Sequence, residues 1–286
     1  MLPDAVSAAL RGLGFLAVLQ AAGATLFLTM LHTDAPAARP RILRLKRWAA
    51  LTGTGLLLAQ YLLEAARMAG SFAGTLDAGL QGLVLHSRVA LTLALRLAGL
   101  LLLALTLRDD GTARRITGLA GALLIAGSFA ATGHTSESPL RWLLGPLLGV
   151  HVLIVAFWFG SLLPLLLVSG LEPAEAAAAL IARFSRLATW TVPLILVAGI
   201  VIAARLLPDM AALRRPYGIG LSLKVLVFAV LMAFAARNKW QLGPALAQGG
   251  GQAALRLRRS LRAELVLIAA VLLGTAALTM FWSPDG

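Results

Sequence analysis

Long apolar runs separated by short basic segments dominate this sequence and restrict its possible folds more than any other feature. Eight runs are long enough for a membrane-spanning helix, which needs about 20 mostly apolar residues. We expect these helices at roughly 10–32, 46–69, 82–107, 114–133, 143–168, 184–206, 217–236 and 262–282. Only 13% of the residues are charged, against about 25% in soluble domains. The sequence therefore predicts an all-α polytopic membrane bundle of about eight transmembrane helices.

The segments between the runs are short, so we expect a single membrane domain over 1–286. The longest connection, about 237–261, contains Gly249-Gly250-Gly251 and predicts a flexible loop. The first run, from Gly12 to Leu31, is too long for the apolar region of a signal peptide and predicts a span instead. Small residues favour close helix contacts in lipid. Those expected at such contacts are Gly53, Gly55, Gly118, Gly121 and Gly199.

The basic residues predict the orientation of the bundle. Sixteen lie in the odd-numbered connections: Arg39, Arg41, Arg44, Lys46, Arg47, Arg108, Arg114, Arg115, Arg183, Arg186, Arg237, Lys239, Arg256, Arg258, Arg259 and Arg262. Six lie on the opposite side: Arg11, Arg67, Arg141, Arg205, Arg214 and Arg215. Cytoplasmic loops carry the excess of Lys and Arg. We therefore expect the N- and C-termini on the outer, periplasmic side.

Several functional classes are disfavoured by what the sequence contains. The net charge of +13 comes from clusters between apolar runs, which is typical of cytoplasmic loops and not of a nucleic-acid-binding surface. The chain has no cysteine, which excludes disulfides, iron–sulfur clusters and thiolate metal sites. It has no GxxxxGK[ST], G-x-S-x-G or H-E-x-x-H signature. We expect neither ATP-driven transport nor an enzyme.

Three of the four histidines fall on the predicted outer side. His134 ends the fourth run, His86 lies near the outer end of the third, and His151 lies about 12 Å into the fifth, from the helical rise per residue. Ionisable groups within a bilayer are costly and commonly functional. Each histidine also has a structural explanation: an interfacial cap for His134, and a hydrogen bond between helices for His86 or His151.

Other possible metal ligands lie at the same level. Glu64 and Met68 are four residues apart and share a helix face, and Met280 ends the last run. Imidazole, thioether and carboxylate together suit copper better than magnesium or calcium. The predicted metal site is therefore His86, His134, His151, Met68, Glu64 and Met280, and it should weaken as pH falls because copper needs the neutral imidazole. Packing alone also explains both methionines.

Two further polar features are less specific. His32 ends the first run on the cytoplasmic side and indicates an interfacial histidine. Arg88, Thr92 and Arg96 form a stripe on one helix that should face the bundle interior, with Glu64 as a natural counter-charge.

The second half of the chain resembles the copper resistance protein D (CopD) family. The resemblance begins at His151-Val152-Leu153 and the segment Phe157-Trp158-Phe159-Gly160-Ser161-Leu162-Leu163-Pro164-Leu165. It continues through Arg183-Phe184-Ser185-Arg186, Pro216-Tyr217-Gly218, Leu223-Lys224, Ala236-Arg237-Asn238 and Leu261-Arg262-Ala263-Glu264, so that it covers about 151–282. In the first half, Gly133-His134 is similar to a pair that follows the family's fourth span.

The resemblance implies a multi-pass protein of the bacterial inner membrane that moves copper from the periplasm towards the cytoplasm. It also implies a separate periplasmic copper-binding partner of the CopC type, since no such domain is fused here. Two other functions stay open from the residues. One is a membrane cytochrome b with His86 and His151 as haem ligands; the other is a copper sensor or scaffold that binds copper without transporting it.

Overall fold

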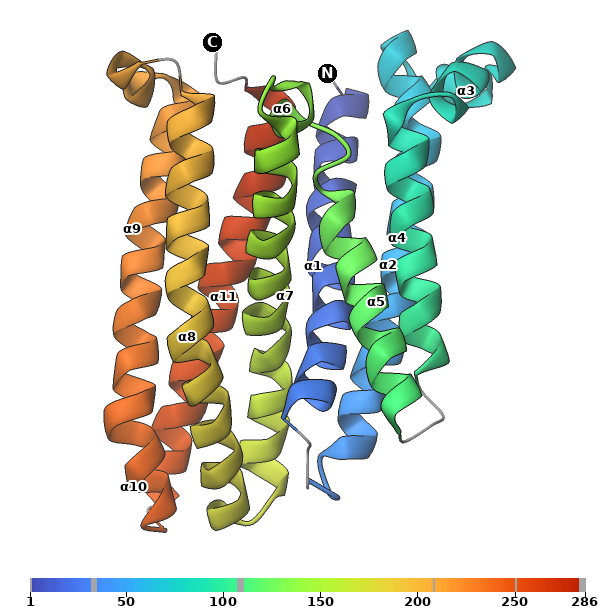
Figure 1. Cartoon of the computed structure of the whole chain (residues 1–286). Helices are drawn as coiled ribbons and strands as arrows, with labels where there is room; N and C mark the ends of the chain where they lie inside the picture. Colours follow the sequence, from blue (N-terminus) through green and yellow to red (C-terminus); the bar gives the residue numbers. More distant parts are fainter. Residues whose placement is uncertain (1, 32–34, 107–110, 208, 250, 283–286) are drawn as a thin grey trace.

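The structure is a computed structural model that describes residues 2–31, 35–106, 111–207, 209–249 and 251–282, without the side chain of His134. In this part of the chain, eight helices have 17 residues or more, and they pack side by side as a bundle (Figure 1). They are α1 (Leu2–Met30), α2 (Arg39–Ala69), α4 (Arg88–Leu105), α5 (Thr112–Ser128), α7 (Arg141–Leu171), α8 (Ala174–Leu206), α9 (Pro216–Arg237) and α11 (Gly251–Phe281). The shorter helical segments are η1 (Phe72–Leu76), α3 (Ala78–Leu85), α6 (His134–Glu137), η2 (Met210–Arg214), η3 (Asn238–Leu242) and α10 (Gly243–Ala247). The predicted all-α class is confirmed.

Six helical stretches of the described chain are long and apolar enough to cross a membrane: α1, α4, α7, α8, α11, and the stretch from α9 through α10. The segments predicted at 46–69 and 114–133 do form helices, α2 and α5, but these fall short of that measure. α2 falls short because it begins with the basic residues that were expected in a connecting loop. α5 falls short because it has only 17 residues. The count of eight spans therefore stays a prediction.

α1 begins and α11 ends at the same end of the bundle, where α3 and α6 also lie. α10 lies at the opposite end (Figure 1). We call these the upper and lower ends. α1 and α7 run through the centre and are mostly buried, whereas few residues of α8 and α9 are buried. Such exposure of apolar helices is expected where lipid is the solvent. The periplasmic position of the termini stays a prediction.

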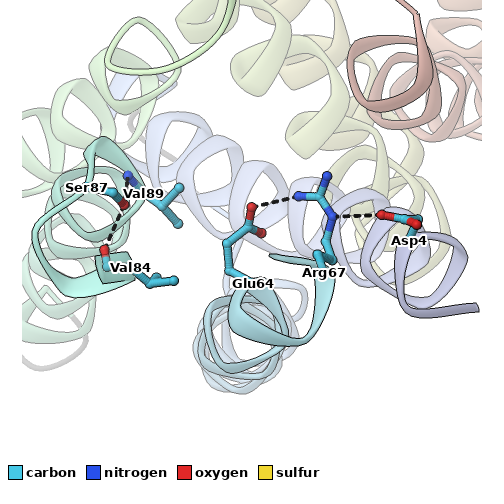
Figure 2. Close-up of polar contacts among 6 residues, drawn as sticks. All are labelled: Asp4, Glu64, Arg67, Val84, Ser87 and Val89. Atoms are coloured by element: carbon cyan, nitrogen blue, oxygen red, sulfur yellow. Dashed lines mark hydrogen bonds and ion pairs between the residues drawn. The ribbon is translucent and has the colours of Figure 1, made fainter. Parts of the chain in front are cut away.

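The run predicted as one helix over 82–107 is divided into α3 and α4. His86 ends α3, and Ser87 begins the next helix as its cap. The Ser87 hydroxyl donates to the Val84 carbonyl (2.7 Å) and accepts from the Val89 backbone N–H (3.1 Å; Figure 2). A serine that satisfies a free N–H at a helix start is a strong local signal for a new helix. The prediction that His86 lies inside a span is wrong.

The predicted flexible loop at 237–261 is also wrong, because most of it is helical. α9 passes into the π-helical turn η3 and then α10, and α11 begins at Gly251. The basic residues after Gly251 therefore lie on the first turns of α11, at the lower end of the bundle (Figure 1).

Candidate functional site

The upper cavity, about 410 Å³ in volume, lies among α1, α4, α7, α8, α9 and α11 in the upper half of the bundle. Most of its wall is aliphatic and aromatic. The charged or titratable side chains that line it are Arg11 of α1, Arg96 of α4, His151 of α7, and Tyr217 and Lys224 of α9. Its volume is in the range of small-ligand sites, which span about 300–1,000 Å³.

His151 is fixed on this wall by a hydrogen bond between helices. Its Nδ1 lies 3.1 Å from the backbone oxygen of Ile195 on α8. A carbonyl oxygen can only accept, so Nδ1 carries the proton and Nε2 keeps a free lone pair. Gly199 of α8 lies beside the ring, and a Cβ there would make an ordinary contact with the His151 Cε1 at 3.6 Å. The structure thus presents one oriented imidazole with a metal-binding nitrogen.

Arg96 is the most buried cation of the upper cavity, at 6% exposure. Its Nε donates to the Ser128 hydroxyl at 3.0 Å. Its guanidinium carbon lies 4.4 Å from the ring centre of Phe129 and 5.5 Å from that of Phe15. Cation–π contacts of this kind stabilise a desolvated arginine.

A second cavity of about 430 Å³ lies below the first, among α7, α8, α9, η3 and α11. Its polar wall includes Glu264, Asn238 and Lys239. Glu264 is 2% exposed, and its carboxylate accepts a hydrogen bond from the Asn238 amide. Trp158 lines the same cavity. We call this the lower cavity.

Three side chains line both cavities and form the partition between them: Trp158, Leu196 and Phe228. The rings of Trp158 and Phe228 meet edge to face, with centres 6.2 Å apart and planes at 86°. Trp158 also shares the wall of the lower cavity with Glu264, so the aromatic partition and the buried carboxylate belong to the same cavity.

The predicted ligand Glu64 is held by an ion pair outside the upper cavity. Its carboxylate lies 2.7 Å from Arg67, whose Nε lies 3.2 Å from Asp4 of α1 (Figure 2). The prediction that Glu64 balances the arginine stripe of α4 is wrong. Arg96 bonds to Ser128 instead, and Arg88 is exposed and donates to the Ser136 carbonyl at 3.4 Å.

Of the other predicted ligands, His86, Met68 and Met280 do not line the upper cavity. His86 is exposed, and its Nδ1 bonds to Gly82 in its own helix at 2.8 Å. Met68 is 54% exposed, and Met280 is half-buried near the end of α11. Gly133 and Thr135, on either side of His134, line the upper cavity, but the His134 side chain and all of His32 lie outside the described residues. Within the described residues, no three His, Asp or Glu side chains form a metal cluster.

His86 and His151, the two haem ligands that the sequence suggested, likewise do not lie together. α3, which His86 ends, packs against α2, α4 and η1, whereas His151 of α7 faces α8. Sequence reasoning missed Glu264 as a functional residue. A carboxylate inside the last apolar run was the available signal, since such groups are rare in spans.

Two family models match the chain on either side of α7. The model for the copper resistance protein D-like N-terminal domain matches residues 1–139, and the model for copper resistance protein D matches residues 178–278. The chain belongs to the copper resistance protein D family. Membership makes it a copper-handling membrane protein, as the sequence resemblance implied. No curated protein and no solved structure matches it. The upper cavity takes its lining from both matched stretches, and His151 and Trp158 come from α7 between them.

Proposed function

We propose that this protein is a copper permease of the bacterial inner membrane, a transporter and not an enzyme. The observation that carries the proposal is the pair of cavities stacked through the bundle and separated by Trp158, Leu196 and Phe228. A transport path needs a binding space accessible from each side and a barrier that opens between them. Membership of the copper resistance protein D family indicates that the proposed cargo is copper.

His151 is the proposed copper ligand of the upper cavity. Copper binds imidazole well, and a histidine oriented through its other nitrogen is the usual form of such a ligand. The hydrogen bond to Ile195 meets this requirement without using Nε2. His134 is a second candidate, because its neighbours in the chain line the same cavity.

The charge distribution supports the orientation that import requires, with the upper cavity on the periplasmic side. Most basic residues of the connections lie at the lower end, so the positive-inside rule assigns that end to the cytoplasm and the upper cavity to the periplasmic side. Copper would then enter beside His151 and leave through the lower cavity. A separate periplasmic protein of the CopC type is the proposed donor.

The test is copper uptake into proteoliposomes that contain His151→Ala, with His86→Ala as the matched control. His86 is exposed and bonded within its own helix, so its loss should leave uptake close to the wild-type rate. His151→Ala should lower uptake severalfold at an unchanged melting temperature. Equal uptake by both folded variants would refute the proposal. Copper binding without uptake by the wild-type protein would favour a sensor, and a Soret band would favour the cytochrome.

A further inference from the structure

The upper cavity has an unusual charge for a metal transporter. Arg11 of α1, Arg96 of α4 and Lys224 of α9 all line it, and no described carboxylate does. Glu64 acts on the charge of Arg11, but its carboxylate is engaged by Arg67 at 2.7 Å. The cavity wall is therefore positive and mostly apolar.

Burial strengthens the electrostatic interactions of these three cations with anything that enters the cavity. Arg96 is 6% exposed, and Arg11 and Lys224 are half-buried. Charges interact more strongly in a poorly hydrated site than in water. Three cations that line one space attract an anion and oppose the entry of a free cation. A bare copper ion would add a further positive charge, with a single described imidazole to bind it.

The size and the wall also fit something larger than an ion. About 410 Å³ is far more than one metal ion occupies, and the apolar side chains suit soft, weakly hydrated ligands such as halide or thiolate. We propose that the upper cavity accepts copper as a small anionic Cu(I) complex with halide or thiolate ligands, and not as the bare cation. This inference rests on the proposed function and names the form of its substrate.

The complex remains Cu(I) throughout, so no oxidant or reductant is needed. Inside the cavity, His151 Nε2 forms a bond to copper as one anionic ligand is displaced. The released anion stays near Lys224 and the two arginines, which balance its charge.

Copper uptake into proteoliposomes tests the inference with two Cu(I) probes. One is dichlorocuprate in chloride buffer, which is anionic; the other is the cationic acetonitrile complex in perchlorate buffer. At equal total Cu(I), we expect faster uptake from dichlorocuprate. Lys224→Gln should lower that uptake by about tenfold, as expected for loss of one nearby charge in a poorly hydrated site.

Two variants control for other effects of the substitution. Lys224→Arg keeps the charge and should retain most of the uptake. Arg183→Gln removes an exposed arginine that lines neither cavity, and should leave the preference for dichlorocuprate unchanged. Melting temperatures of all variants establish that they fold.

The outcomes separate the two proposals. Faster uptake of the cationic probe, or Lys224→Gln uptake equal to wild type with dichlorocuprate, would overturn the anionic substrate and leave the permease intact. Uptake of both probes unchanged by His151→Ala would overturn the permease itself. Anionic lipid that co-purifies in the cavity and is not displaced by dichlorocuprate would also overturn the inference.

Discussion

The contact between α1 and α7 depends on two glycines that face each other at the centre of the bundle, and Gly23→Ala tests it. An added Cβ at Gly23 would lie 1.9 Å from the Ala156 backbone oxygen and 2.6 Å from the Gly160 Cα. These are backbone atoms, which cannot rotate away as a side chain can. The two helices would have to separate, and both line the upper cavity.

The destabilisation follows from two contributions. Forcing an extra carbon into a well-packed contact costs about 1–3 kcal/mol. Separation of the helices also weakens the buried hydrogen bond from Gln20 Nε2 to the Gly160 oxygen at 2.9 Å, which contributes about 1 kcal/mol. We therefore expect Gly23→Ala to lower the free energy of unfolding by roughly 2–4 kcal/mol.

Thermal unfolding of the purified protein in detergent measures this effect, and Gly55→Ala is the matched control. Gly55 also lies inside a helix, but nothing lies within 4 Å of its added Cβ. Alanine is the better helix former by up to about 1 kcal/mol, so the control should melt at or above the wild-type temperature. If Gly23→Ala melted as Gly55→Ala does, the close approach of α1 and α7 would be refuted.

Two further substitutions test the polar groups. Glu264→Ala leaves the buried N–H donor of Asn238 without its acceptor and should destabilise the protein by about 1–3 kcal/mol; Glu264→Gln, which keeps an acceptor oxygen, should cost much less. Equal melting temperatures for the two variants would contradict this hydrogen bond. Glu64→Gln should leave copper affinity nearly unchanged in a competitive chelator titration, because Arg67 already occupies that carboxylate. A large loss of affinity would instead place copper at the upper rim.

The helix positions were predictable because apolar length alone determines where a chain can cross lipid. The sequence did not predict which glycines bring helices together. Gly118 and Gly121 do lie at close contacts, with an added Cβ 2.9 Å from Thr25 and 2.8 Å from the Gly99 oxygen, whereas Gly55 faces open space. A glycine in the sequence shows only that a close approach is allowed. The partner depends on packing between distant helices.

The candidate site was predictable to the same limited extent. A mid-span histidine is unusual by itself, so His151 stood out, and the structure places it in a cavity. Glu64 and Met68 stood out in the same way, but neither lines the upper cavity, and Glu64 is paired with Arg67. The partition could not be inferred, because Trp158 and Phe228 are 70 residues apart in the chain and each is an ordinary apolar residue in its helix.

In the proposed permease, His151 and Glu264 would act on copper in two different cavities. A closed site with three or four strong ligands holds a metal tightly, whereas a conducting site must bind well enough to admit its cargo and weakly enough to release it. The upper cavity offers the His151 imidazole, and the lower cavity offers the Glu264 carboxylate, whose hydrogen bond from the Asn238 amide must be exchanged before it can bind a metal. Copper that reached Glu264 would therefore compete with the Asn238 amide for the carboxylate, and that competition would favour release of the metal over its retention.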